Sequence, residues 1–373
     1  MNMLLGKIQM RKLVHMVKKL KNRFVPQHLY EKVKSYLRLN IPKLSRDLSL
    51  IEDGHYLAVH HPDWFGVGVA TQELFKNTIS IPEVLSKRKA RSVTKLFLKK
   101  PFRMFVFSGL AYGWEYIIEG LKKNDPSLII KIIWHGGNSL NVEKYDWNRF
   151  QKMFELHDKG IIHTICFVKK SMASFYAAKG YRTTHIMNNI YSFMPAPSVV
   201  KQKSLPAQTI RIGLYVSGDR WIKNMFNQLA AISLIPGAVV DCVPLSDTTD
   251  RFAGLLHMQI EGAWQSLSRA ELLTRMAKND VNLYATYSEC APLIPLESFQ
   301  LGVPCITGNN HHYWDDSMLK KFVVVDEVDN PYAIHQKIME CLNNKEQVMK
   351  LYRDWKQNYD IEATQSLRKF LSI

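Results

Sequence analysis

Two glutamates in the second half of the chain are the side chains best suited to chemistry. Glu289 and Glu297 are separated by seven residues. They lie in a segment, residues 284–307, that is expected to form a strand, a loop, a helix and, after Gly-Val-Pro, another strand. Glu297, in the first turn of that helix, is suited to accept two hydrogen bonds from a ribose diol, and Glu289 to reach sugar hydroxyls. The backbone N–H groups of the Cys290–Ile294 turn and the helix N-terminus favour an anion. These features suit a ligand that carries both hydroxyl groups and an anionic group.

Two basic residues, Arg220 and Lys223, follow a strand expected at residues 210–216. A departing nucleoside diphosphate gains negative charge, so cations here are expected to stabilise it. His135 follows a strand expected at residues 127–134, and we expect it to touch the donor sugar or the acceptor. The alternatives are structural. The glutamates would then be solvated helix-flank charges, Arg220 and Lys223 surface cations, and His135 a hydrogen-bonded histidine of the scaffold.

Metal-ligand patterns are weak. The pairs His60-His61 and His311-His312 lack a Cys or carboxylate at ligand spacing, and no Asp-x-Asp occurs. We therefore expect neither a metal nor another cofactor. The five cysteines are scattered without a CxxC pair and are expected to be buried thiols in a reducing compartment. Residues 309–313, which follow the last strand of the glutamate segment, are a candidate lining for the base or sugar pocket.

The elements that must position these side chains alternate between strand and helix, which predicts α/β structure with parallel sheets covered by helices on both faces. Expected strands in the first half are 56–60, 103–108, 127–134, 164–168 and 183–187, with a glycine-bearing loop at 65–68. Expected strands in the second half are 210–216, 239–243, 255–260, 281–285, 303–307 and 322–325. A capping box at Ser268–Glu271 starts a helix. Two successive doubly wound, Rossmann-like domains would face each other across a ligand cleft.

Three segments are expected: an N-terminal extension over 1–50, an acceptor-binding domain over 51–200 and a donor-binding domain over 201–373. The Pro- and Ser-bearing stretch at 194–206 reads as the linker. The last helix is a candidate to return to the first domain. In the extension, Met10, Leu13, Val17, Leu20 and Phe24 recur at helical spacing opposite basic residues, which fits either a membrane-surface helix or one packed on its own domain.

The chain carries 50 Lys and Arg against 33 Asp and Glu, a net charge of +17. The excess lies in residues 1–200, with 32 basic and 14 acidic residues, whereas residues 201–373 hold 18 and 19. Such a charge predicts an anionic partner. No secretory signal and no membrane-spanning stretch are found in the sequence, so we expect a cytoplasmic protein with, at most, peripheral membrane contact.

The segment 284–307, with 212–224, the Trp134-His135-Gly136 strand end and the strand end at 187–189, resembles retaining GT-B glycosyltransferases of family 4. The resemblance covers most of the chain from about residue 56. One departure is that Arg220 and Lys223 are three apart, where the family usually has about five, and another is that the first glycine loop is looser. The resemblance implies catalytic roles for Glu289, Arg220, Lys223 and His135. It implies donor binding by Glu297, Cys290, Ala291, Pro292, Leu293, Ile294, Gly66 and Gly68.

The expected activity is transfer of a sugar from a nucleotide sugar, UDP-linked rather than GDP-linked, to a hydroxyl, with retention at the anomeric carbon. The expected acceptor is a glycan or a polyprenyl-diphosphate-linked glycan at the inner face of the membrane, in bacterial surface polysaccharide or lipopolysaccharide assembly. The basic half would then face anionic lipid. Two alternatives remain: a GT-B enzyme of other chemistry, an epimerase or phosphorylase, and a basic nucleic-acid-binding protein, although no nucleic-acid-binding module is visible.

Overall fold

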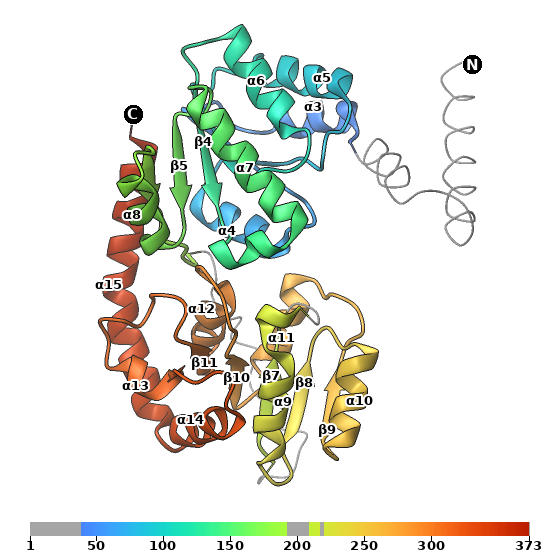
Figure 1. The fold of residues 1–373 in the computed structure, drawn as a ribbon, viewed down its shortest axis with the longest axis vertical. Coiled ribbons are helices and arrows are strands. Elements are labelled where there is room, and N and C mark those ends of the chain that lie inside the picture. The colour runs from blue at the N-terminus through green and yellow to red at the C-terminus, as the bar shows by residue number, and fades with distance from the viewer. Residues whose placement is uncertain (1–38, 192–208, 217–219, 373) are drawn as a thin grey trace, which may run out of the picture. The chain divides into compact units, whose positions relative to one another are not determined.

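The computed structural model describes residues 39–191, 209–216 and 220–372, and contains two six-stranded parallel sheets with intervening helices (Figure 1). The predicted α/β class with two doubly wound sheets is confirmed. The first sheet has the order β2-β1-β3-β4-β5-β6. Its strands are β1 (Tyr56–His60), β2 (Thr78–Ser80), β3 (Met104–Ser108), β4 (Ile129–Trp134), β5 (Thr164–Phe167) and β6 (Thr183–His185).

The second sheet has the order β12-β11-β10-β7-β8-β9. Its strands are β7 (Arg211–Leu214), β8 (Val239–Cys242), β9 (Gln259–Gly262), β10 (Val281–Tyr284), β11 (Cys305–Gly308) and β12 (Val324–Val325). Every residue of β8, β10 and β11 is buried, as expected for parallel strands covered on both faces. The order in which successive strands are added reverses between β7 and β10, since β8 and β9 extend the sheet on one side of β7 and β10 to β12 extend it on the other. Loops that leave the carboxyl ends of these two strands diverge, and this is where α/β sheets bind ligands.

Helices connect the strands and follow them. In the first half these are α3 (Ile41–Ser49), α4 (Phe65–Leu74), α5 (Lys87–Phe97), α6 (Trp114–Asn124), the 3₁₀ helix η1 (Asn138–Val142), α7 (Lys144–Asp158) and α8 (Lys170–Ala178). In the second half they are the 3₁₀ helix η2 (Trp221–Lys223), α9 (Met225–Ser233), α10 (Asp247–Leu255), α11 (Arg269–Met276), α12 (Leu293–Gln300), α13 (Leu319–Val323), α14 (Pro331–Asn343) and α15 (Lys345–Leu371). The capping box predicted at the start of α11 is present.

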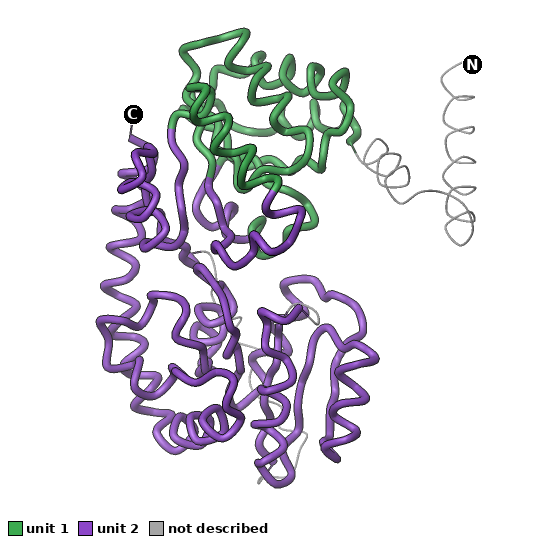
Figure 2. Tube along the Cα trace, in the orientation of Figure 1, with its two compact units in different colours: residues 1–68, 77–132, 148–163 green, residues 69–76, 133–147, 164–373 purple. Residues whose placement is uncertain are grey.

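The chain divides into two compact units (Figure 2). The first comprises residues 1–68, 77–132 and 148–163, and the second comprises 69–76, 133–147 and 164–373. The division runs through β4 and α4, so β5, β6 and the residues that follow β4 belong to the second unit together with the whole second sheet. The contacts described below for the candidate site lie within the second unit, except those of Gly66 and Gly68, which lie within the first.

An aromatic cluster fixes α15 in the second unit. The Phe299 and Tyr352 rings stack at 4.4 Å between centroids, Trp314 and Trp355 lie 4.5 Å apart, and Trp355 stacks on Tyr359 at 4.4 Å. Each such ring pair contributes about 0.5–1.5 kcal/mol beyond the burial of its area. The cluster therefore holds α15 against α12 and the loop after β11.

Several predicted elements differ from the structure. Residues 255–260, expected as one strand, are the end of α10 and the start of β9. Residues 322–325, also expected as a strand, form the end of α13 and the two-residue β12. The separate helices expected over residues 346–358 and at the chain end are the single helix α15. In the first two cases a short apolar run did not distinguish helix from strand.

The expected linker at 194–206 and the amphipathic helix expected within residues 1–24 both lie outside the described residues. Within the part of the chain that the structure describes, no helix is both long and apolar enough to cross a membrane. All five cysteines are buried and free, as expected from the sequence.

Candidate functional site

Lys223 and Glu289 come together at the carboxyl ends of β7 and β10. Lys223 ends η2, which follows β7, and Glu289 lies in the loop after β10. The Lys223 Nζ atom is 2.5 Å from Glu289 Oε1 and 3.1 Å from the Tyr284 hydroxyl, which donates to Glu289 Oε1 at 3.0 Å. The two charged side chains are only 11% and 14% exposed. The structure therefore unites two of the predicted catalytic residues in one largely buried cluster.

The backbone around Lys223 is held by the next residue and by α9. Asn224 adopts the left-handed region with φ +53°, and its Nδ2 donates to the carbonyls of Ala285 at 2.8 Å and Val328 at 2.5 Å. Gln228 Nε2 donates to the Lys223 carbonyl at 3.0 Å, while its Oε1 accepts from Ala285 N at 2.8 Å. These bonds tie the start of α9 to the end of β10, so the position of Lys223 relative to Glu289 is fixed by the scaffold.

Tyr284 keeps its proton in this cluster. Burial raises the pKa of Tyr284 well above its ordinary value, and the adjacent Glu289 carboxylate raises that pKa further. Tyr284 therefore acts as a neutral donor, and the ammonium of Lys223 balances the carboxylate of Glu289. An ammonium carries three hydrogens, so Lys223 retains capacity for a further acceptor.

Arg220 and Lys223 have different partners. Arg220 is exposed, and its Nη2 lies 3.3 Å from Glu143 Oε1. Residues 217–219, which precede Arg220, lie outside the described residues. The two residues predicted to bind the diphosphate therefore differ: Lys223 is buried in the cluster, whereas Arg220 is exposed and contacts Glu143, the residue after η1.

Glu297 lies in the second turn of α12, and the expectation of the first turn is wrong. The helix starts at Leu293 because Pro292 serves as its N-cap residue and Pro295 fits within the first turn. Arg269 Nε contacts Glu297 Oε1 at 2.9 Å. Burial raises the pKa of Glu297, and Arg269 opposes that rise. The Glu297 carboxylate is therefore paired with an arginine, whereas the Glu289 carboxylate is held by a lysine and a tyrosine.

Arg269 also contacts Glu73 of α4, with Nη1 at 2.9 Å from Oε1. The Glu73 and Glu297 side chains are 2% and 6% exposed, so one guanidinium serves two buried carboxylates. Glu73 Oε2 accepts from the backbone N of Tyr191 at 2.9 Å. This bridge places α4 against α11 and α12 next to the predicted ribose-binding residue.

The Cys290–Ile294 segment leads into α12. Cys290 is buried, and burial raises the pKa of its thiol to about 12, so the thiol stays protonated. Ala291 offers its carbonyl to Asn188 Nδ2 at 2.9 Å. No side chain caps the N-terminus of α12, so the first-turn N–H groups at Leu293 and Ile294 remain suited to an anion.

The segment after β4 lies against the Glu289 loop. A Cβ at Gly137 would stand 3.3 Å from Cys290 Sγ, and Ser139 Oγ is 2.5 Å from Ser288 Oγ. His135 opens this segment. Its Nε2 is buried without a hydrogen-bond partner among the described residues, and burial lowers the pKa of the imidazole to about 4. His135 is therefore neutral near pH 7 and is not the hydrogen-bonded structural histidine of the alternative interpretation.

Gly66 and Gly68 are not in a loop. They lie in the first turn of α4, which begins at Phe65, and Gly68 N bonds Trp64 O at 2.7 Å. A Cβ at Gly68 would stand 3.2 Å from His60 Nδ1, whereas a Cβ at Gly66 would meet nothing within 4 Å. Only Gly68 is therefore required by close packing.

Sequence reasoning missed Tyr284, Arg269 and Lys169. Tyr284 ends the strand before Glu289, and a polar aromatic at a strand's carboxyl end is a signal that was available. Lys169 Nζ donates to the backbone carbonyls of Glu289 at 3.2 Å and Asn310 at 2.7 Å. The contacts of Lys169, like the contact of Arg269 with Glu73, join segments more than a hundred residues apart. They therefore produce no pattern of residue spacing that could be recognised within one segment of the sequence.

No family model matches the sequence, and no curated protein matches it. Solved structures do match. HepE of Anabaena, solved in complex with UDP, aligns with a TM-score of 0.60 at 11% identity over 85% of this chain and 98% of that chain. A glycosyltransferase from Rickettsia africae aligns with a TM-score of 0.58 at 12% identity over 86% and 97%. The chain has the GT-B fold.

Sucrose-phosphate synthase from Thermosynechococcus elongatus supports the same assignment, with a TM-score of 0.57 at 16% identity over 79% of this chain and 82% of that chain. At these identities the likeness establishes the GT-B fold, and the roles of individual residues must come from the site. In this GT-B chain the Lys223–Glu289 cluster occupies the carboxyl edge of the second sheet, at its switch point.

Proposed function

We propose that the protein is a retaining glycosyltransferase of the family 4 type, which transfers a sugar from a nucleotide sugar to an acceptor hydroxyl. The observation that carries this is the buried Lys223–Glu289–Tyr284 cluster at the switch point of the second sheet. A buried cation beside the open N-terminus of α12 suits a diphosphate, and carboxylates nearby suit hydroxyl groups.

The donor is proposed to lie along this edge. Lys223 and the first turn of α12 hold the diphosphate, and Arg220 adds charge from the rim. Glu297 accepts hydrogen bonds from the ribose through Oε2, because Oε1 is engaged with Arg269. Glu289 and neutral His135 contact the sugar hydroxyls. UDP is favoured over GDP, in keeping with the UDP bound in the Anabaena protein.

In the proposed reaction the bond between the anomeric carbon and the β-phosphate oxygen breaks, and a bond from that carbon to the acceptor oxygen forms on the same face. The acceptor proton passes to the leaving phosphate. Charge therefore accumulates on the diphosphate, where Lys223 and the α12 N–H groups stabilise it. We assign no enzyme nucleophile, metal or other cofactor to this reaction.

The proposed acceptor is a glycan or a polyprenyl-diphosphate-linked glycan of bacterial surface polysaccharide or lipopolysaccharide assembly. Helix α5 supports a membrane surface nearby. It has no acidic residue, it buries Ala90, Val93, Thr94 and Phe97, and it exposes basic residues. Those exposed residues are Lys87, Arg88, Arg91 and Lys95. Near an anionic surface each contributes about 1 kcal/mol. The protein would then act at the inner face of the plasma membrane.

The test is a thermal-shift screen of the full chain against UDP-, GDP- and ADP-hexoses, followed by transfer assays with the stabilising donor. We expect UDP-sugars to raise the melting temperature most. We also expect Glu297→Ala to abolish nearly all transfer while circular dichroism stays unchanged. Full activity of Glu297→Ala would show that Glu297 is not part of the donor site. If no nucleotide sugar raised the melting temperature, the proposed function would be wrong.

A further inference from the structure

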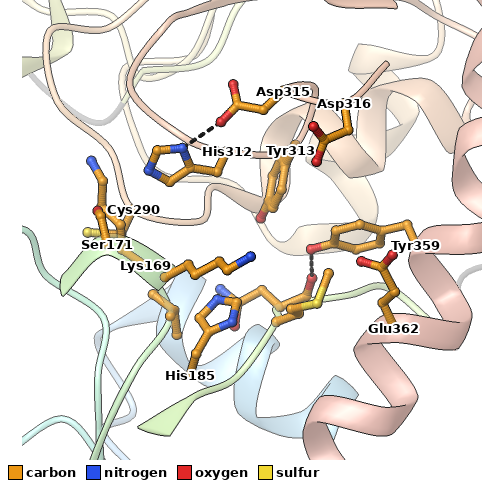
Figure 3. Close-up of a pocket in the computed structure, with 14 residues that line it drawn as sticks. Lys169, Ser171, His185, Cys290, His312, Tyr313, Asp315, Asp316, Tyr359 and Glu362 are labelled. Atoms are coloured by element: carbon orange, nitrogen blue, oxygen red, sulfur yellow. Dashed lines mark hydrogen bonds and ion pairs between the residues drawn. The ribbon is translucent and has the colours of Figure 1, made fainter. Parts of the chain in front are cut away.

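A cavity lies beside the loop that carries Glu289, wholly within the second unit (Figure 3). Its volume is about 360 Å³. The ends of β5 and β6, the loop after β11 and one face of α15 form its walls (Figures 1 and 3). Cys290, the residue next to Glu289, lines one side, and Lys169 bonds the Glu289 carbonyl from within the wall. The cavity therefore adjoins the loop that we propose for the donor sugar without including Glu289 itself.

One buried polar atom in this wall lacks a hydrogen-bond partner among the described residues. Asn188 is 3% exposed, and its Nδ2 is committed to the Ala291 carbonyl, which leaves Oδ1 without a hydrogen-bond partner among the described residues. The Tyr313 hydroxyl is buried beside the hydroxyl of Tyr359, which is its polar partner. Tyr359 donates its own hydroxyl to the Asn188 carbonyl at 2.6 Å. A buried amide oxygen left unpaired costs free energy, so this wall favours a ligand that donates to it.

Three carboxylates also line the cavity (Figure 3). Asp316 and Glu362 are exposed, both line the cavity, and neither forms an ion pair within the described ranges. Asp315 differs, because its two oxygens contact His312 Nδ1 at 2.7 Å and Lys320 Nζ at 3.0 Å. Asp316 and Glu362 are thus the carboxylates of this wall that are available to a ligand.

The charges of the wall nearly cancel. Lys169 and Lys170 oppose the carboxylates of Asp316 and Glu362, and Asp315 is already paired. An anionic ligand would meet carboxylates, and an apolar ligand would leave Asn188 Oδ1 unpaired. A neutral polyol satisfies both conditions, because each hydroxyl can donate to a carboxylate or amide oxygen and accept from an ammonium or phenol.

We propose that this cavity binds one pyranose unit of the acceptor, held by Asn188, Tyr313, Asp316 and Glu362. The proposal rests on the proposed function, since it assigns the acceptor side of the same reaction. The aromatic cluster around Trp355 and Tyr359 fixes the positions of Tyr313 and α15, so this subsite is preformed. A sugar here lies next to the donor loop through Cys290 and Lys169.

The test separates the acceptor subsite from the donor site. Saturation-transfer NMR is recorded on the full chain with methyl glycosides of glucose, galactose and N-acetylglucosamine, in the absence and presence of saturating UDP. We expect at least one glycoside to bind in both conditions. Displacement by UDP would assign the sugar to the donor pocket, and binding of no glycoside would remove the subsite; either result overturns the proposal.

Variants locate the binding. Glu362→Gln, Asp316→Asn and Tyr313→Phe are each expected to weaken glycoside binding five- to fifty-fold and to leave the Kd for UDP unchanged. Glu346→Gln, an exposed position on the same helix α15 and outside the cavity, is the matched control and should change neither. Unchanged glycoside binding in all three cavity variants would overturn the proposal.

Kinetics distinguish this inference from the proposed function. With an acceptor in hand, the cavity variants should raise the acceptor KM and leave the donor KM and the slow hydrolysis of the donor unaltered. A raised donor KM would contradict the acceptor assignment. Glycoside binding without any UDP binding would instead contradict the proposed function, and with it the acceptor role, while leaving a sugar-binding cavity.

Discussion

Lys223 and Glu289 form an ion pair of 2.5 Å that also contacts the Tyr284 hydroxyl, at the point where the strand order of the second sheet reverses. Glu289 already accepts from Lys223, so a diphosphate that binds Lys223 has to share it with Glu289. Replacement of Glu289 should therefore change how tightly Lys223 binds a diphosphate. Replacement of Lys223 should weaken diphosphate binding directly.

Glu289→Gln should separate nucleotide binding from transfer. The substitution removes the charge that competes for Lys223, so UDP is expected to bind as well as, or more tightly than, in the wild type. Transfer is expected to fall at least about a hundredfold, because the sugar hydroxyls lose a carboxylate acceptor. Calorimetry and a transfer assay measure the two effects. A weakened UDP affinity together with unchanged turnover would reverse this assignment.

Arg269→Ala should destabilise the fold. Glu73 and Glu297 would remain as two buried carboxylates without a cation, at a cost on the order of 3 kcal/mol. Arg269→Lys should recover only part of this, since a lysine does not present two donors in a fixed fork. Urea unfolding at pH 7.5 measures the difference. Arg251→Ala, at an exposed position of α10, is the control, and an equal effect there would exclude the bridge as the cause.

His135 should make the protein acid-sensitive. Its folded pKa is about 4, below the ordinary value of 6.5, so between these values the unfolded chain binds the extra proton. Stability is then present above pH 6.5 and is lost as the pH falls towards 4, by about 2–3 kcal/mol from this residue. His135→Asn should lose correspondingly less between pH 7.5 and 4.5. Urea unfolding measures the free energy of unfolding at both pH values. An equal loss of that free energy in the wild type and in His135→Asn would show that His135 is not a neutral, buried imidazole.

Membrane association should depend on the basic first half. Neutralising Lys87, Arg88 and Arg91 of α5 to Gln should weaken binding to vesicles of anionic phospholipid about fivefold per residue at low salt. Lys278, Lys350 and Lys369, exposed in the second half, form the matched control set. Co-sedimentation with the vesicles measures the binding of the α5 variant and of the control variant. Unchanged binding of the α5 variant, or salt-dependent retention of RNA in preference to vesicles, would contradict the membrane assignment.

A companion variant lacking residues 1–24 tests the amphipathic stripe of the N-terminal extension. If this helix lies on the membrane, the shortened protein should lose most of its vesicle binding. If it packs on its own domain, the shortened protein should bind vesicles as before but unfold at lower urea. The two alternatives therefore give opposite patterns in two measurements.

The sequence was sufficient to predict two parallel sheets and the strands that precede Lys223 and Glu289, β7 and β10. Both residues follow buried parallel strands, and the strands that pair in such sheets bring their carboxyl ends to one edge. The first residue of α12 was misplaced because Pro295 suggests a helix start, whereas the chain begins the helix two residues earlier. That shift moves Glu297 into the second turn.

Contacts between distant segments could not be predicted. Arg269 and Glu73 are 196 positions apart, and Lys169 and Asn310 are 141 apart. The cavity wall likewise combines Asn188, Tyr313 and Glu362 from three separate segments. Hydrophobic periodicity reports on one element at a time, so such pairs become visible only when the packing of the elements is known.

Titration of the full chain with UDP tests the central assignment most directly. The account predicts saturable binding by the wild type and by Lys350→Ala, and a ten- to hundredfold weaker Kd for Lys223→Ala, since a charge-assisted hydrogen bond to a phosphate is worth about 1.5–3 kcal/mol. Calorimetry supplies all three values. Equal affinity for UDP in the wild type and Lys223→Ala, or no binding of UDP by the wild type, would contradict it.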